Sequence, residues 1–200
     1  MTAVQQGLFG REAAAIDERF ESVRRIELYG GAWIEYQQGW LRGHEQVFAT
    51  LREESAWRQQ RRVMYERLVD VPRLEAHLPD DGPGHPVIER MQTALARRFG
   101  TVFDTVSLAL YRDGRDSVAW HGDQVARDMP NSVMATVSVG APRRFLLRPK
   151  QGGGSIALSL GWGDLVVMGG TCQRTWEHCV PKVAHAAPRL TIMLRPLWRR

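Results

Sequence analysis

The second half of the chain alternates apolar and polar residues with the period of a β-strand. The clearest case is residues 155–162, where Ile156, Leu158, Leu160 and Trp162 alternate with small or hydroxyl-bearing residues. A period of two places such residues on one face of a strand. Similar segments, separated by glycine- and proline-containing turns, predict strands at 105–111, 117–120, 132–140, 143–149, 155–161, 164–169, 177–180 and 189–195. So many short strands in succession favour a jelly-roll or another barrel.

The first half of the chain shows the three- and four-residue spacing of helices. Segments at about 43–56 and about 86–99 are predicted to be helical, the second because Ile88, Met91 and Leu95 fall on one face. Residues 58–73 are rich in arginine and have no clear period, so no regular structure is expected there. Residues 1–22 are polar and rich in alanine, and we expect them to pack loosely against the rest.

The composition is that of an ordinary globular protein, with 44% hydrophobic and 24% charged residues. A chain of 200 residues is long enough for one domain with a sizeable core, so we expect a single domain over 1–200. No apolar run is long enough to span a membrane, and Met1–Gly10 lacks the pattern of a signal peptide. We therefore expect a cytoplasmic protein in which Cys172 and Cys179 stay reduced.

The charge is basic, with a formal net charge of +5, and arginine accounts for all but two of the 27 basic residues. Arginine is suited to bidentate contacts with phosphates and carboxylates, and a basic chain often binds a polyanion. An arginine-rich coding bias would give the same count. Charge alone therefore leaves nucleic-acid binding open.

His121 and Asp123 are separated by one glycine at the end of a predicted strand. Period two would point both side chains to the same side. A histidine nitrogen and a carboxylate oxygen, completed by a distant second histidine, form the ligand set typical of non-haem iron(II) oxygenases. Because this spacing is common by chance, it needs support from elsewhere in the chain.

The last predicted strand gives that support. Within 189–195, Arg189 and Arg195 share one face with Thr191 and Met193, while leucine and isoleucine occupy the other. Two arginines inside a small barrel would be costly to bury without an anionic partner, and a dicarboxylate would supply one. The alternative is that this face is exposed to solvent.

The second histidine is expected one hairpin before this strand. His178, in a predicted strand, is the first candidate, and His185, in the following loop, competes with it. His44, His77 and His85 are more simply read as structural histidines.

Four segments together resemble the AlkB-type nucleic-acid dealkylases. They are 110–123, which ends in Trp-His-Gly-Asp, 135–145, 176–182 and 188–195. The similarity is clear over about 100–200 and fainter over about 60–99. It implies an α+β, mainly β fold: a double-stranded β-helix (jelly-roll) core over about 100–200, and an N-terminal extension over about 1–99. That extension would contain helices and, within about 58–80, a substrate-binding lid.

The resemblance also implies the roles of the site residues. His121, Asp123 and His178 would be the catalytic residues that bind iron(II). Tyr111, Arg189, Thr191 and Arg195 would line the site of the cosubstrate 2-oxoglutarate. The sequence departs from the family at Ala109 and Thr191, where asparagine is usual, so two amides are missing from this pocket.

For the substrate, the resemblance implies an alkylated base. The residues expected to contact it are Met64, Tyr65, Arg73, His77, Trp120 and Arg143. A basic margin around the pocket mouth is expected from Arg58, Arg61, Arg62, Arg67, Arg73, Arg143 and Arg148. The alternative is that these arginines pair with acidic residues on a solvated surface.

The implied reaction uses O2 and removes alkyl groups from bases such as 1-methyladenine and 3-methylcytosine, releasing formaldehyde and succinate. Single-stranded DNA or RNA is the expected partner of a monomeric enzyme. Duplex DNA is a further candidate, at the cost of unstacking the base. Two alternatives remain: an oxygenase of the same fold acting on a modified RNA, a small molecule or a protein, and a non-catalytic nucleic-acid-binding barrel.

Overall fold

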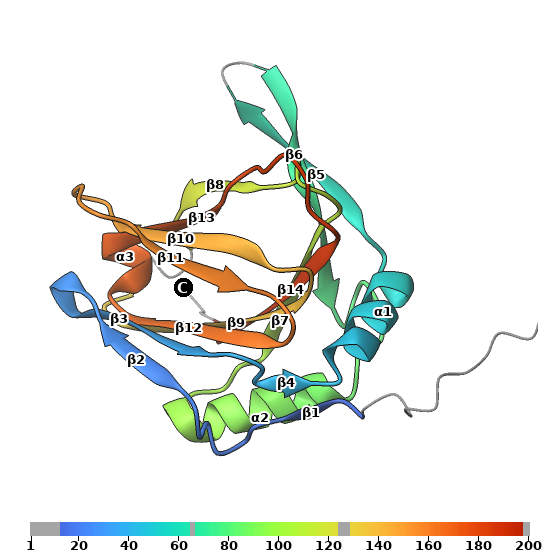
Figure 1. The fold of residues 1–200 in the computed structure, drawn as a ribbon, viewed down its shortest axis with the longest axis horizontal. Helices are drawn as coiled ribbons and strands as arrows, with labels where there is room; N and C mark the ends of the chain where they lie inside the picture. The colour runs from blue at the N-terminus through green and yellow to red at the C-terminus, as the bar shows by residue number, and fades with distance from the viewer. Residues whose placement is uncertain (1–12, 65–66, 124–128, 198–200) are drawn as a thin grey trace, which may run out of the picture.

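Two facing antiparallel sheets form the body of the molecule (Figure 1), and the computed structural model describes residues 13–64, 67–123 and 129–197. The smaller sheet has the strand order β11 (Ile156–Leu160), β10 (Arg143–Pro149), β13 (Trp176–Val180) and β8 (Val118–His121). The larger sheet has the order β2 (Arg24–Glu27), β3 (Ala32–Gln37), β12 (Asp164–Gly170), β9 (Ser132–Gly140), β14 (Arg189–Arg195), β7 (Thr105–Tyr111), β6 (Arg67–Leu78) and β5 (Arg58–Met64). A short pair, β1 (Ala15–Ile16) and β4 (Leu41–Arg42), lies beside them.

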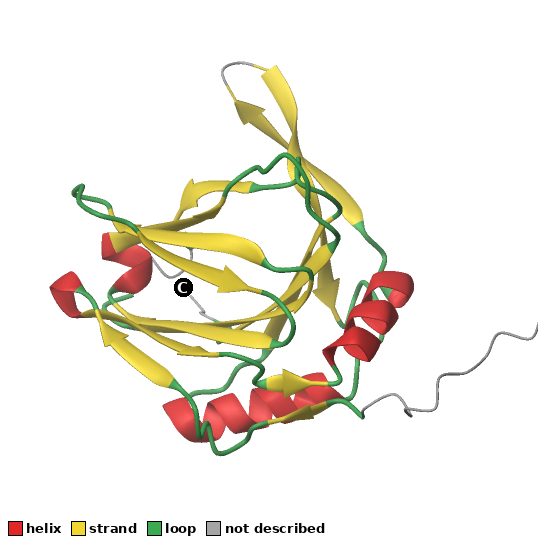
Figure 2. Cartoon of the chain, viewed as in Figure 1, coloured by secondary structure: helices red, strands yellow, loops and turns green. Residues whose placement is uncertain are grey.

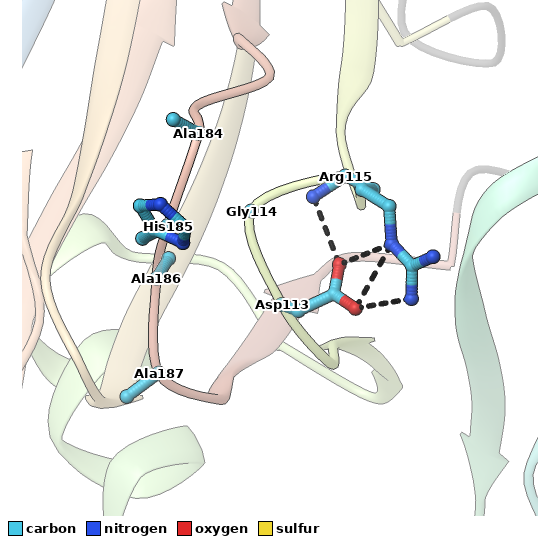
Figure 3. Close-up of a pocket in the computed structure, with 7 residues that line it drawn as sticks. All are labelled: Asp113, Gly114, Arg115, Ala184, His185, Ala186 and Ala187. Atoms are coloured by element: carbon cyan, nitrogen blue, oxygen red, sulfur yellow. Dashed lines mark hydrogen bonds and ion pairs between the residues drawn. The ribbon is translucent and has the colours of Figure 1, made fainter.

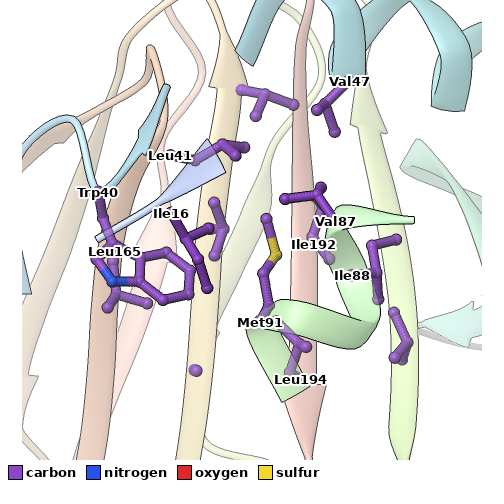
Figure 4. Packing of buried hydrophobic residues seen from close by; sticks show 14 of the residues in the cluster. Ile16, Trp40, Leu41, Val47, Val87, Ile88, Met91, Leu165, Ile192 and Leu194 are labelled. Carbon is purple, nitrogen blue, oxygen red and sulfur yellow. The ribbon is translucent and has the colours of Figure 1, made fainter. Parts of the chain in front are cut away.

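Two helices, α1 (His44–Glu54) and α2 (Val87–Phe99), cover the outer face of the larger sheet (Figure 2). The apolar face of α2 explains its position, because Ile88 and Met91 are buried against Ile192 and Leu194 of β14 (Figure 4). Glycine at position 100 adopts a positive φ of 65° and ends α2. The remaining helical turns are η1 (Tyr29–Gly31) and α3 (Cys172–Thr175).

A second apolar cluster fills the space between the two sheets. It contains Tyr111 from the larger sheet and Phe145, Leu147 and Trp176 from the smaller one. The sheets therefore enclose an interior, as expected of a jelly-roll. The side chains that face this interior come from both sheets.

The predicted strands agree closely with the observed ones. Those at 105–111, 132–140, 143–149 and 189–195 have the predicted bounds, and the other four differ by one residue at one or both ends. Period-two alternation is a local signal and therefore survives in the fold.

Two expectations for the first half were wrong. Within residues 58–73, which were expected to be irregular, 58–64 and 67–73 belong to the paired strands β5 and β6. This hairpin extends away from the two sheets (Figure 1) and continues the larger sheet through β6. Its polar residues mask the alternation, but cross-strand pairs such as Arg61 with Asp70 stabilise it. Residues 1–22 were expected to pack loosely, yet Ile16 and Phe20 are buried and Phe20 stacks on Trp40. Residues 1–12 lie outside the described part of the chain.

Strands β2 and β3 were not predicted. In the described residues, no helix is long and apolar enough to cross a membrane.

Candidate active site

A cavity of about 340 Å³ lies between the two sheets and opens beside the β5–β6 hairpin. It is lined from both sheets. The lining includes nine residues that the sequence had singled out, namely Arg73, His77, Tyr111, His121, Asp123, His178, Arg189, Thr191 and Arg195. The candidate metal ligands, cosubstrate residues and two of the candidate substrate residues therefore share one space.

His121 and His178 face each other across the pairing of β8 with β13, with ring centroids 4.3 Å apart. The Nδ1 atom of His121 lies 2.8 Å from the carbonyl oxygen of Ala119. Because a carbonyl oxygen only accepts hydrogen bonds, Nδ1 carries the proton of the neutral ring, and Nε2 keeps its lone pair.

Burial also keeps both rings neutral. It lowers the pKa of His121 and lowers the pKa of His178 well below its usual value. The neighbouring positive charge of Arg73 acts in the same direction on both pKa values. Neutral imidazole is the form that binds a metal ion.

Asp123 follows β8 and contacts Gln173 and Arg195. Its backbone N–H donates a hydrogen bond to Oε1 of Gln173 at 2.7 Å, and its carboxylate Oδ2 accepts one from Nη1 of Arg195 at 2.7 Å. In this arrangement, no three His, Cys, Asp or Glu side chains among the described residues are grouped closely enough to hold an ion. His121 and His178 are adjacent, and the carboxylate of Asp123 contacts Arg195 in the same cavity.

Arg189 is buried inside the cavity wall, with 1% of its surface exposed. Its Nη2 donates to Oγ of Ser138 at 2.8 Å, and its guanidinium lies 5.2 Å from the ring centroid of Tyr111. Within the described residues, its Nε and Nη1 atoms make no hydrogen bond. Burial lowers the pKa of Arg189 to about 10. A buried cation with two unused donor atoms is costly, and a carboxylate in the cavity would accept a hydrogen bond from one of them.

The two positions that depart from the family face each other. Thr191 and Ala109 are cross-strand partners in the pairing of β14 with β7, and the Thr191 hydroxyl donates to the Ala109 carbonyl at 3.3 Å. Both residues line the cavity. At these two positions, where the AlkB-type dealkylases usually have asparagine amides, this chain has the methyl group of Ala109 and the hydroxyl of Thr191, which is already hydrogen-bonded.

Some of the candidate substrate residues line the cavity and others do not. Arg73 and His77 line the cavity, and Arg73 forms an ion pair of 2.5 Å with Glu75. Trp120 does not line it: its ring packs under the guanidinium of Arg148 at 4.0 Å. Neighbouring residues of a strand point to opposite faces, so Trp120 points away from the side of His121.

Arg143 was expected at the pocket mouth, and this was wrong. It is 3% exposed and donates to the carbonyl oxygens of Asp113, Asp116 and Pro181 at 2.7–3.0 Å. Three carbonyl acceptors offset the cost of burying its charge. Met64 ends β5, while its side chain, Tyr65 and the side chains of Arg62 and Arg67 lie outside the described part of the chain.

The other margin arginines have acidic partners. Arg58 pairs with Asp81, Arg61 with Asp70, Arg73 with Glu75 and Arg148 with Glu177. Of these four arginines, Arg73 lines the cavity, and all four belong to mixed charged pairs rather than to a purely basic margin.

The residues that the sequence analysis missed include Glu75, which lines the cavity, and Gln173, which adjoins it. Glu75 lies two residues after Arg73 on β6, so predicting the hairpin would have placed it in the cavity. Gln173 carries no sequence signal, because the turn α3 that positions it was not predicted.

A second hollow lies between the loop of Asp113–Arg115 and residues Ala184–Ala187 (Figure 3). His185 belongs to this exposed loop and does not line the cavity of His121. Of the two candidate second histidines, only His178 faces His121.

Known proteins resemble this chain in sequence and in fold. Residues 73–195 match the model of the 2OG-Fe(II) oxygenase superfamily. The human alpha-ketoglutarate-dependent dioxygenase alkB homolog 3 is 27% identical over 198 residues, which covers 88% of this chain and 67% of that protein. The mouse DNA oxidative demethylase ALKBH2 is 30% identical over 149 residues, covering 64% of this chain and 62% of that protein. The chain thus spans about two thirds of the length of these relatives.

Solved structures show the same fold at low identity. The structure of OsALKBH1 matches 85% of this chain and 100% of its own, with a TM-score of 0.60 at 15% identity. A prolyl hydroxylase from Trichoplax adhaerens matches 76% of this chain and 74% of its own, with a TM-score of 0.56 at 13% identity.

Proposed function

Because this chain belongs to the 2OG-Fe(II) oxygenase superfamily, we propose that it removes alkyl groups oxidatively from nucleic-acid bases. Iron(II), 2-oxoglutarate and O2 would be used, and bases such as 1-methyladenine and 3-methylcytosine would be the substrates. The observation that carries the proposal is Arg189, which is buried with two unused donors in the cavity that also holds His121 and His178.

The residues present fit the groups that the family implies. Two neutral imidazoles and one carboxylate, His121, His178 and Asp123, are the donor set suited to iron(II) with open coordination positions. The free donors of Arg189 fit a carboxylate of 2-oxoglutarate in a charge-assisted pair. Tyr111, Thr191 and Arg195 line the same wall and would complete that subsite.

When bound, iron(II) and 2-oxoglutarate supply oxidation of the alkyl C–H bond by O2, with 2-oxoglutarate converted to succinate and carbon dioxide. The hydroxylated methyl group then leaves the base nitrogen as formaldehyde. The chain orients the base and excludes water. Met134, Phe145 and Met193 give the cavity an apolar lining near the histidines, and Arg73, Glu75 and His77 supply polar contacts on β6.

The nucleic-acid substrate is supported by the relatives, one of which is named a DNA oxidative demethylase. It is also supported by the position of the β5–β6 hairpin at the cavity mouth, since a hairpin there can cover a base that has left its stack.

The test is mass spectrometry of methylated oligonucleotides after incubation with iron(II), ascorbate and 2-oxoglutarate. We expect the methyl group to be lost with the wild-type chain and with His185→Ala, and to be retained with His178→Ala. Retention of the methyl group by the wild-type chain, while 2-oxoglutarate is still converted to succinate, would refute the nucleic-acid substrate.

One observation favours a second candidate. Arg58, Arg61, Arg73 and Arg148 all have carboxylate partners, so these arginines do not need a polyanion to neutralise them. An oxygenase of the same fold acting on a small molecule or a protein uses the same metal and cosubstrate residues. Succinate formation in the presence of such a substrate would identify it.

A further inference from the structure

Gln173 forms a direct hydrogen bond with the residue that carries the candidate carboxylate ligand. It lies in α3 with 1% of its surface exposed, and its Oε1 accepts the backbone N–H of Asp123 at 2.7 Å. Its Nε2 faces Sδ of Met168 at 3.7 Å. Because the Asp123 N–H can only donate, the amide is oriented with its oxygen towards Asp123.

The backbone of Gln173 packs against Gly122, the residue that precedes Asp123. A Cβ added at Gly122 would lie 2.4 Å from the carbonyl oxygen of Gln173, so only glycine fits there without displacing α3. The same carbonyl accepts a hydrogen bond from Nζ of Lys150 at 3.0 Å. Gln173 thus contacts both residues that follow His121: its backbone packs on Gly122, and its side chain holds Asp123.

The turn α3 is itself anchored from the other side. The hydroxyl of Thr171 donates to the carbonyl of Gly30 at 2.7 Å, and Nε1 of Trp176 donates to the carbonyl of Tyr29 at 3.1 Å. The chain then runs directly into β13 and reaches His178 five residues after Gln173. One short anchored segment therefore carries both the histidine that faces His121 and the amide that holds Asp123.

We propose that Gln173 is a positioning residue for metal binding: it fixes the main chain of Asp123 relative to His178, so that only the Asp123 side chain has to turn from Arg195 towards the two imidazoles when a metal ion binds. The proposal rests on the proposed function, because it assumes that His121, Asp123 and His178 are the ligands. Residues that orient metal ligands typically change metal affinity by about 10- to 100-fold when they are replaced.

The test measures metal binding without turnover. Cobalt(II) is titrated into the metal-free chain, and its visible absorption spectrum reports both affinity and ligand geometry. Gln173→Met keeps the length and volume of the side chain but removes the acceptor for the Asp123 N–H. The matched control is Gln37→Met, since Gln37, on strand β3, is also buried and its side chain donates a hydrogen bond to Asp17 at 2.7 Å.

We expect Gln173→Met to weaken cobalt(II) binding by about 10- to 100-fold and to alter the spectrum, while Gln37→Met binds as the wild type does. Thermal unfolding of both variants shows whether they lose similar stability. The positioning role would be overturned if Gln173→Met bound cobalt(II) as tightly as the wild-type chain does. It would also be overturned if both variants lost cobalt(II) affinity to the same extent. Absence of cobalt(II) binding by the wild-type chain would overturn the metal site itself, and with it this proposal.

Discussion

Arg195 and Asp123 are in direct contact, with Nη1 of the arginine donating to Oδ2 of the carboxylate at 2.7 Å. The two residues were assigned from the sequence to different tasks, Arg195 to the cosubstrate and Asp123 to the metal. Arg189, by contrast, contacts Ser138 and has no carboxylate partner among the described residues. The two arginines of β14 are therefore not equivalent.

Replacing Arg189 should impair cosubstrate binding and spare the metal. In Arg189→Met, a carboxylate of 2-oxoglutarate loses a charge-assisted contact of about 1.5–3 kcal/mol. The dissociation constant for 2-oxoglutarate should therefore rise roughly 10- to 150-fold, with cobalt(II) affinity unchanged. Calorimetric titration of each ligand measures this. Arg195→Met, which removes the partner of Asp123, is expected to change both affinities, and unchanged 2-oxoglutarate affinity in Arg189→Met would refute the assignment.

Restoring the amides should strengthen cosubstrate binding. Ala109 and Thr191 face each other in the cavity wall, and asparagine at either position adds an N–H donor for a carboxylate. We expect the KM for 2-oxoglutarate to be high in the wild-type chain and to fall by up to about 10-fold in Ala109→Asn and Thr191→Asn. Ala109→Val, which adds volume without a donor, is the control. The prediction fails if Asn and Val at this position have the same effect.

Arg143 should matter for stability rather than for substrate. Arg143→Met leaves three carbonyl oxygens without their donor, each at a cost of about 1–3 kcal/mol. The free energy of unfolding in urea should fall by about 3 kcal/mol or more. The partly exposed pair of Arg148 with Glu177 is the comparison, and Arg148→Met should cost only about 1 kcal/mol. Similar losses in the two variants would contradict the buried role of Arg143.

The metal-free protein should lose stability as the pH falls below about 6.5. Burial lowers the pKa of His178 and of His121 in the folded chain, so the unfolded chain, with a histidine pKa near 6.5, takes up protons first. This contribution is complete above about pH 6.5 and is lost as the pH falls towards the folded-state pKa values. Tm should therefore drop between pH 7.5 and pH 5.5, less so in His178→Gln than in His185→Gln. If Tm depended on pH in the same way in both variants, protonation of His178 would not be the cause of the loss of stability.

Binding of single-stranded methylated DNA should depend on salt. If Arg58, Arg61, Arg73 and Arg148 exchange their carboxylate partners for phosphates, affinity should fall by roughly tens of fold between about 50 and 200 mM salt, with little dependence on base sequence. Fluorescence anisotropy with labelled oligonucleotides measures it. A flat response would favour the second candidate, an oxygenase whose substrate is not a polyanion.

Much of the site was predictable because its signals are local. His121 and Asp123 are two residues apart, and Arg189 and Arg195 lie on one strand whose alternation is strict. Such periods report which side chains share a face before any partner strand is known. The same reasoning was less successful for the β5–β6 hairpin, where charged residues on both faces hide the period and only cross-strand pairing reveals the strands.

The sequence by itself determined most strands of the jelly-roll, the candidate ligand pair of the His-Gly-Asp segment and the arginine face of β14. The tertiary structure decided which histidine meets His121, that Arg143 is buried among carbonyls, that Arg148 packs on Trp120, and that Gln173 holds Asp123. The physical reason is the range of the interactions. Alternation is set by neighbouring residues, whereas burial and partner choice depend on strands that are far apart in the chain and meet only when the two sheets close.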